Sequence, residues 1–345
     1  MIALKYLALV FRYTSINSAR MRVVATVLLV ASLVPVCGST APKDARQLER
    51  TPYEFAFDSY AAWLAFMDTA PDPSWQAPAM KTLVPEATFD NYRAGRTVRA
   101  ERISYLNDNL RINGFMVAYK QCEPVCPVII YAQGGVAQWS RTTFFDLLEM
   151  HRLAAQGFIV LSTSRRGEGG SEGTANLGAG DLSDTLALID IVDQLPEADG
   201  TTINYFGFSR GGALGYRVLA GTDRINAAVM LGAPSDSLLS PRRAEFHDAV
   251  YPGIVDGYEA DPDAALRALS ALYWPERLSE RTRLLLLHGG SDKRVHPYNS
   301  LRLVDRLQGL GRSPRLVLFE QGSHSLIEHY VDVRREIDRW FSVER

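Results

Sequence analysis

Ser209 stands in a sequence pattern that could carry nucleophilic chemistry. It lies between Gly207 and Gly211, at the end of the apolar run TINYFGF and just before a helix-length segment. A serine on such a sharp strand-to-helix turn is forced toward positive φ, so the positions two before and two after it must be nearly free of side chain. The turn also aims the backbone N–H groups at the helix start toward the atom under attack. The pattern therefore predicts an exposed nucleophile beside donors that could stabilise an oxyanion.

Two other residues have the chemistry and the position to activate this serine. A serine hydroxyl is a weak nucleophile at neutral pH, so it needs a histidine base that a carboxylate orients. Asp292 follows the apolar run RLLLLHG by a short glycine-rich loop, and His324 follows RLVLFEQ in the same manner. The order serine, acid, base is the chain order that accompanies this turn. We therefore expect Ser209, Asp292 and His324 to form a catalytic triad. The other histidines are expected on helices, at a strand end, in an insertion or near the entrance to the site: His151, His329, His288, His247 and His296.

An oxyanion needs a second donor besides the backbone N–H of Arg210. The segment YAQGGVAQW follows the first buried run and offers the backbone of Gly134 or Gly135 and the side-chain amide of Gln133. These alternatives stay open on the sequence alone. The glycine-rich segment 164–173 lacks the lysine and the glycine spacing of phosphate-binding loops. We interpret it as a loop that lets the backbone pass close under the site.

The elements that must position these residues follow from hydrophobic patterning. Short apolar runs alternate with helix-length segments, and they read PVIIYA, FIVLSTS, TINYFGF, NAAVMLGA, RLLLLHG and RLVLFEQ. Such runs are too continuous for half-exposed strands, so they predict an α/β fold with a mostly parallel sheet and helices on both faces. Sheets of this kind place their sites at the carboxyl ends of strands. Before them, RISYLNDNLRINGFMVAY predicts two strands around an Asn-Asp-Asn turn.

The chain divides into three expected regions. Residues 1–38 contain the apolar run VVATVLLVASLVPV and are interpreted as a signal peptide or an N-terminal anchor, which predicts a periplasmic, secreted or membrane-tethered protein. Residues 39–100 are expected to form a helical extension, and residues 101–345 the catalytic domain. Within that domain, residues 235–280 interrupt the strand-helix rhythm, and either a small helical cap over the site or a surface elaboration would explain them.

Composition and cysteines narrow the class of protein. The 345 residues are 47% hydrophobic and carry a net charge of −2, which favours a globular protein and argues against a nucleic-acid partner. Cys122 and Cys126 are a close pair in an apparently exported chain, which favours a disulfide over two free thiols. Their spacing, without clustered histidines, argues against a zinc site.

With these residues in place, the chain from about residue 101 resembles the catalytic domain of the prolyl oligopeptidase family, within the α/β-hydrolase superfamily. The likeness rests on five segments in family order: PVIIYAQGG, AAQGFIVLSTSRRGEGGSEG, INYFGFSRGG, LLLLHGGSDKRVHPYNSLRLVDRLQ and GSHS. The resemblance implies Ser209 as nucleophile, Asp292 as orienting acid and His324 as base. It also implies an acyl-enzyme intermediate and no metal or organic cofactor.

Two departures from the family pattern limit what can be carried over. Oligopeptidases of this family have a β-propeller before the hydrolase domain, and residues 39–100 are too few to form one. Many relatives place a tyrosine, or the histidine of an HGG-type motif, where this chain has Gln133. We therefore expect a serine hydrolase acting on a short peptide or a carboxylic ester, with a carboxylesterase lacking peptidase activity as one alternative and a noncatalytic binding protein of the same fold as another.

Overall fold

The computed structural model describes residues 46–69, 76–135, 142–239 and 250–342. The expected signal peptide or anchor at 1–38 lies outside these ranges. Within them, no helix has both the length and the apolar character needed to cross a membrane.

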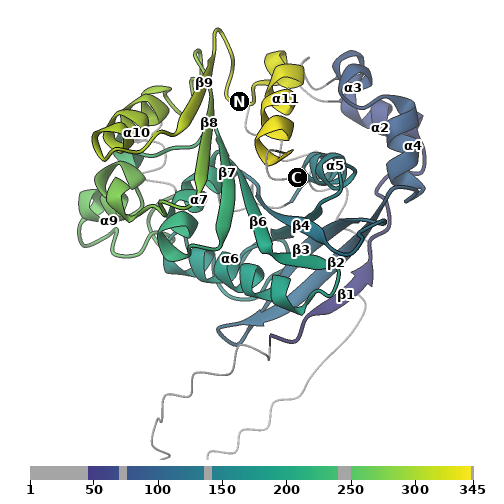
Figure 1. The fold of residues 1–345 in the computed structure, drawn as a ribbon, viewed down its shortest axis with the longest axis horizontal. Coiled ribbons are helices and arrows are strands. Elements are labelled where there is room, and N and C mark those ends of the chain that lie inside the picture. The colour runs from purple at the N-terminus through teal and green to yellow at the C-terminus, as the bar shows by residue number, and fades with distance from the viewer. Residues whose placement is uncertain (1–45, 70–75, 136–141, 240–249, 343–345) are drawn as a thin grey trace, which may run out of the picture. The chain divides into compact units, whose positions relative to one another are not determined.

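In the part of the chain that the structure describes, nine strands form one sheet in the order β1-β2-β3-β5-β4-β6-β7-β8-β9 (Figure 1). The strands are β1 (Glu49–Pro52), β2 (Val98–Asn107), β3 (Leu110–Tyr119), β4 (Cys126–Ala132), β5 (Ile159–Thr163), β6 (Ala198–Phe208), β7 (Ile225–Leu231), β8 (Arg283–Gly289) and β9 (Arg315–Phe319). Pairing is parallel from β5 through β4 and β6 to β9, and antiparallel among β1, β2, β3 and β5. The prediction of a mostly parallel sheet is confirmed, and the six predicted apolar runs are strands β4 to β9.

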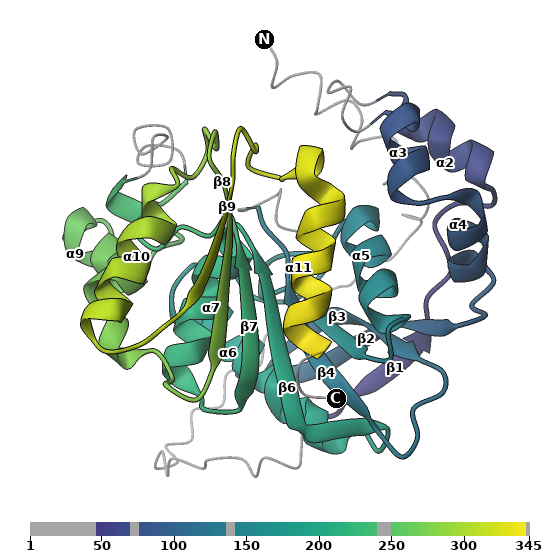
Figure 2. The same ribbon diagram turned by 45° about the horizontal axis from the view of Figure 1, so that its top comes forward.

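Helices cover both faces of this sheet (Figure 2). The structure has α2 (Tyr60–Met67), α3 (Ala77–Leu83), α4 (Glu86–Arg93), α5 (Phe144–Ala154), α6 (Ala179–Ile191), α7 (Arg210–Gly221), α9 (Pro262–Ala268), α10 (Tyr298–Gly309) and α11 (Tyr330–Ser342). Helices α6, α7 and α10 bury side chains in one apolar cluster, and α2 to α5 with α11 bury theirs in another.

Alternating residues of the central strand β4 join these two clusters. Val128 and Ile130 belong to the cluster under α6, α7 and α10, whereas Ile129 and Tyr131 belong to the opposite one. Because successive strand residues point to opposite faces, an apolar run without polar interruption is what a doubly covered strand requires.

The hairpin of β2 and β3 turns at Asp108 and Asn109, with φ angles of 52° and 60°. Two consecutive positive φ angles suit the tight turns of hairpins, and Asn and Asp adopt them more readily than most residues. The Asn-Asp-Asn segment was therefore a sound turn signal.

The N-terminal extension is only partly helical. It contains helices α2, α3 and α4, and β1 adds an edge strand that pairs with β2 from Glu49↔Ser104 to Pro52↔Glu101. Its sequence, ERTP, is mostly exposed and has no apolar alternation. Its partner lies some fifty residues further along the chain, so no local pattern announces it.

The insertion expected at 235–280 contains α9 and the short 3₁₀ turns Ser237–Leu239, Ala271–Tyr273 and Pro275–Arg277. A small buried apolar cluster contains Val255, Tyr258 and Leu266 of this segment together with Leu177, which precedes α6. This segment is therefore a packed unit that emerges between β7 and β8. Its residues 240–249, which include His247, lie outside the described ranges.

The sulfurs of Cys122 and Cys126 form a disulfide. The bond closes the connection between β3 and β4, and Cys126 is the first residue of β4. It lies at the opposite end of β4 from the segment that contains Gln133 and Gly134.

Candidate active site

Ser209 occupies a strained turn between β6 and α7. Its backbone has φ 53° and ψ −119°, in the region that side chains rarely adopt. A Cβ on Gly207 would lie 2.5 Å from the carbonyl oxygen of Gly211, and one on Gly211 would lie 1.9 Å from that of Ala132. The turn is therefore compatible only with glycine at both positions, for the reason that the sequence pattern predicted.

The structure brings the three predicted triad residues together. The Nε2 atom of His324 lies 3.0 Å from Ser209 Oγ, and its Nδ1 lies 2.7 Å from Asp292 Oδ2. Ser209 follows β6, Asp292 follows β8 and His324 follows β9, so all three stand at the carboxyl edge of the sheet. Gly232, which directly follows β7, lies against the ring of His324.

Asp292 is held as a carboxylate by several donors. Its Oδ1 accepts the backbone N–H groups of Arg294 and Val295 at 2.8 and 3.0 Å. Burial by itself would raise the pKa of Asp292, but hydrogen bonds from His288 and His324 and the charge of His324 outweigh it and hold the pKa well below its usual value. The carboxylate thus accepts the Nδ1 proton of His324, which leaves Nε2 free to accept the proton of Ser209.

His288 contributes to this arrangement in a way that sequence reasoning did not recognise. It is fully buried, its Nε2 lies 2.9 Å from the carbonyl oxygen of Val295 and 3.4 Å from Asp292 Oδ2, and its Nδ1 lies 2.7 Å from Ser300 Oγ. The residue ties the acid loop to β8 and α10. The expected position near a strand end agrees with its place in β8, and the four-residue spacing to Asp292 was the available signal.

The loop after β4 lies directly against the nucleophile. A Cβ built on Gly134 would come within 3.2 Å of Ser209 Cβ, so this residue faces the serine with little room to spare. The side chain of Gln133 is directed elsewhere, because its Nε2 donates to the carbonyl oxygen of Thr163 at 3.3 Å. Of the predicted second donors, the geometry favours the backbone of Gly134 over the amide of Gln133.

A group of buried charges surrounds this loop. Arg165 and Glu168 come from the loop after β5, and Asp181 comes from α6. Arg165 pairs with Glu168, and Arg210 pairs with both Glu168 and Asp181. The glycine-rich segment does pass close to the site, as the sequence suggested. The roles of Arg165 and Glu168 were missed, because their contacts with Gln133 and Arg210 join parts of the chain that lie far apart in sequence.

The other described histidines are engaged outside the triad. Burial lowers the pKa of His151 to about 4, and its Nδ1 lies 2.6 Å from the carbonyl oxygen of Leu147. His296 stacks near Tyr298, and the Nε2 of His329 lies 3.0 Å from the carbonyl oxygen of Glu320. In the described ranges, no group of three or more histidine, cysteine or acidic side chains is arranged to hold a metal ion.

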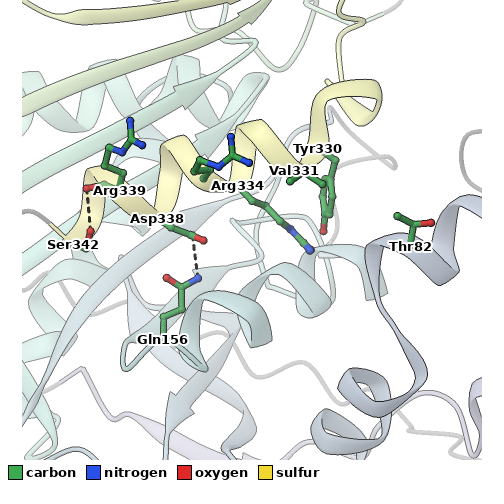
Figure 3. Close-up of a pocket in the computed structure, with 9 residues that line it drawn as sticks. Thr82, Gln156, Tyr330, Val331, Arg334, Asp338, Arg339 and Ser342 are labelled. Carbon is green, nitrogen blue, oxygen red and sulfur yellow. Dashed lines mark hydrogen bonds between the residues drawn. The ribbon is translucent and has the colours of Figure 1, made fainter.

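A cavity of about 680 Å³ lies away from the triad, along α11 (Figure 3). Its walls include Thr82 of α3, Gln156 beyond α5, and Arg334 and Asp338 of α11. The guanidinium of Arg334 donates to the carbonyl oxygen of Leu83 and to Glu149, and Asp338 accepts from Gln156. Asp338 also pairs with Arg152, so both charges have partners, and none of the predicted site residues lines the cavity.

The sheet order, the strained serine turn and the strand-end loops define an α/β-hydrolase. Residues 143–343 match the model of the prolyl oligopeptidase family. The chain belongs to that family, as the sequence motifs predicted.

Individual relatives agree with this assignment. The chain is 23% identical over 258 residues to the "Uncharacterized peptidase YtmA" of Bacillus subtilis, covering 70% of this chain and 93% of that one. It is 26% identical over 304 residues to the "Probable dipeptidyl-aminopeptidase B" of Aspergillus oryzae, covering 80% of this chain and 32% of that one. The acylaminoacyl peptidase of Pyrococcus horikoshii superposes with a TM-score of 0.60 at 20% identity, covering 72% of this chain and 43% of that one.

The chain therefore spans about a third of the fungal relative and less than half of the archaeal structure. All strands in the described ranges belong to the one sheet, so these ranges contain no propeller. The family and the peptidase names of the relatives support a hydrolase, a serine peptidase of the prolyl oligopeptidase family.

Proposed function

We propose that this chain hydrolyses peptide bonds of short peptides through an acyl-enzyme intermediate on Ser209, with His324 as general base and Asp292 as the acid that orients it. One observation carries the proposal. A continuous series of contacts, 2.7 Å from Asp292 Oδ2 to His324 Nδ1 and 3.0 Å from His324 Nε2 to Ser209 Oγ, ends at a half-buried serine held in a strained turn. Strain of this kind persists where the surrounding structure over-determines it, and it is common at active sites.

In the proposed reaction, His324 Nε2 takes the proton of Ser209 as its Oγ attacks the carbonyl carbon of the substrate. The carbonyl oxygen becomes an oxyanion, which the backbone N–H groups of Arg210 and Gly134 are placed to receive. His324 then gives the proton to the leaving amine, and the acyl group stays on Ser209. Water repeats the sequence with His324 as base, which releases the acid and restores the serine.

A carboxylic ester is the second candidate substrate, and the position of Gln133 favours it. The side-chain amide of Gln133 donates to the carbonyl oxygen of Thr163. In the sequence, Gln133 takes the position at which many members of the family have a tyrosine, whose phenol is a donor. An amide needs strong protonation of its leaving group and full oxyanion stabilisation, whereas an ester needs less of both. Absence of a phenolic donor would therefore lower the rate on amides more than the rate on esters.

A fluorophosphonate probe and two chromogenic substrates test the proposal. The wild-type protein is expected to react with the probe, and Ser209→Ala to lose both labelling and hydrolysis. Ser342→Ala is a matched control, because Ser342 ends α11 and its hydroxyl contacts the carbonyl of Arg339, outside the site. Labelling that survives Ser209→Ala would refute this nucleophile.

Rates on p-nitrophenyl acetate and on aminoacyl p-nitroanilides separate the two substrate classes. Turnover of anilides that disappears in Ser209→Ala supports the peptidase. Hydrolysis of the ester alone, with every anilide inert, would replace the peptidase with the esterase.

Export of the protein is also a proposal. The apolar run 23–36 supports a signal peptide or anchor, and the bond between Cys122 and Cys126 suits an oxidising compartment. Mass spectrometry of the amino terminus of the protein, after cell fractionation, tests this. A cytoplasmic protein that begins at residue 1 would contradict it.

A further inference from the structure

Two buried arginines hold the loop that faces the nucleophile. The Nη1 group of Arg165 donates to the carbonyl oxygen of Gln133 at 3.3 Å. The Nη1 group of Arg210 donates to the carbonyl oxygen of Gly135 at 3.1 Å. The residue between these two carbonyls is Gly134, which packs against Ser209. The loop is therefore fixed on both sides of the residue that faces the serine.

One carboxylate connects the two arginines. Glu168 pairs through Oε2 with Arg165 Nε at 3.2 Å and through Oε1 with Arg210 Nη1 at 2.8 Å. Asp181, on α6, pairs with Arg210 Nη2 at 2.7 Å. All four residues are buried, and their formal charges balance.

Burial makes the geometry of this group strict. A buried charge is costly unless it is paired and hydrogen-bonded. Movement of Arg210 would break the ion pair of Asp181, and movement of Arg165 would leave Glu168 with one arginine in place of two. The planar guanidinium also fixes the directions of its donors, which an ammonium would not. The two carbonyl contacts are therefore held by an ionic framework that spans the loop after β5, helix α6 and the start of α7.

The peptide between Gln133 and Gly134 is the part of the loop on which this framework acts. A trans peptide is planar, so its C=O and N–H groups point in opposite directions. Holding the Gln133 oxygen toward Arg165 therefore directs the Gly134 N–H away from Arg165. Two glycines in succession would otherwise allow this segment many backbone conformations.

We infer that Arg165 and Arg210 are positioning residues that fix the oxyanion-binding peptide beside Ser209. The inference rests on the proposed function of the site. The arginine side chains do not contact the substrate in this arrangement, and they act through the backbone of the loop. Glu168 fixes the position of one arginine relative to the other, because it pairs with both. The glycine-rich segment 164–173 thereby has a role beyond close passage of the backbone.

Substitution of Arg165 tests the inference. Arg165→Lys keeps the charge that Glu168 requires but cannot reproduce the fork of donors, and Arg165→Met removes both. We expect kcat per active site to fall about 10-fold in the lysine variant and about 100-fold in the methionine variant, with KM changed less than threefold, because a displaced oxyanion donor weakens transition-state binding. Active sites are counted by fluorophosphonate titration, so loss of folded protein does not enter the rate.

Arg166→Lys is the matched control. Arg166 is the next residue, it also pairs with a buried carboxylate, Asp184, and it additionally pairs with Asp108. In the described ranges, the hydrogen bonds and ion pairs of Arg166 go to Asp184 and Asp108 and not to the loop after β4. The kcat of Arg166→Lys is therefore expected to stay within twofold of wild type.

Affinity for a boronic acid separates positioning from a purely structural role. The boronate forms a tetrahedral adduct on Ser209 with an oxygen in the oxyanion position, so its affinity should fall by the same factor as kcat/KM in each Arg165 variant. Wild-type kcat and boronate affinity in Arg165→Lys would overturn the inference, as would equal losses in Arg166→Lys. Activity that survives Ser209→Ala would instead overturn the proposed function, so the two failures are distinguishable.

Discussion

Gly211 provides a sensitive test of how closely the nucleophile turn packs against the loop after β4. An alanine Cβ at this position would lie 1.9 Å from the carbonyl oxygen of Ala132, and atoms of this kind do not approach within 3.0 Å. The turn and the end of β4 must therefore separate by about 1.1 Å, the difference of these two distances. Because Gly134 lies two residues beyond Ala132, the predicted oxyanion donor moves with the strand.

Two effects of opposite sign act on stability in Gly211→Ala. Alanine is better than glycine within a helix by about 1 kcal/mol, and Gly211 is the second residue of α7. Overpacking of a closed interior costs about 1–3 kcal/mol. The contact is with backbone, which cannot turn aside like a flexible side chain, so we expect the steric cost to prevail and the free energy of unfolding to fall by up to about 2 kcal/mol.

The loss of rate should exceed the loss of stability. A misplacement of about 1 Å at a reacting centre can lower the rate about 100-fold, so kcat per titrated site should fall by that order in Gly211→Ala. Urea denaturation measures the stability, and ester hydrolysis measures the rate. Gly309→Ala in α10 is the control, because a Cβ there meets no atom within 4 Å. Wild-type activity in Gly211→Ala would refute the close packing of turn and loop.

Three further outcomes are expected. Asp292→Asn should lower kcat about 10⁴-fold in steady-state assays, since an amide no longer fixes the tautomer of His324, and a loss below tenfold would contradict the proposed acid. The free energy of unfolding should fall by up to about 3 kcal/mol as the pH drops from 6.5 to 4, because His151 is protonated near pH 6.5 in the unfolded chain but only near pH 4 in the folded chain. Thermal unfolding of His151→Phe across this range should lack this contribution to the pH dependence of stability. Parallel curves of stability against pH for wild type and variant would contradict it. Replacing both Cys122 and Cys126 by alanine should lower the free energy of unfolding by about 2 kcal/mol in urea titrations, because the disulfide closes a short loop. It should leave kcat unchanged, because the loop lies at the end of β4 opposite to the site. Lost activity with intact stability would contradict this.

The sequence predicted the parallel part of the fold well because each element there carries its own local signal. A strand buried on both faces must be apolar throughout, as in PVIIYA, and the runs are spaced by segments of helix length. Strand β1 lacked such a signal, since its exposed residues are held by hydrogen bonds to β2. Edge strands of this kind are specified by their partner and leave little trace in their own residues.

The same distinction separates the site residues that could be predicted from those that could not. Ser209, Asp292 and His324 each follow a strand whose burial is readable, so their convergence could be expected from chain order and sheet geometry. Arg165 and His288 could not be assigned in this way. Their roles depend on contacts with Gln133 and Asp292 that arise from packing between separate loops.

The location of the segment between β7 and β8 has a consequence for which parts of this chain can vary. Strand β7 lies between the strand that carries the nucleophile and the strand that precedes the acid, and both are hydrogen-bonded to it. Their separation is a property of the sheet and does not depend on the connection that leaves β7. Evolution or directed design can therefore lengthen, shorten or exchange residues 235–280 while the reacting groups keep their spacing.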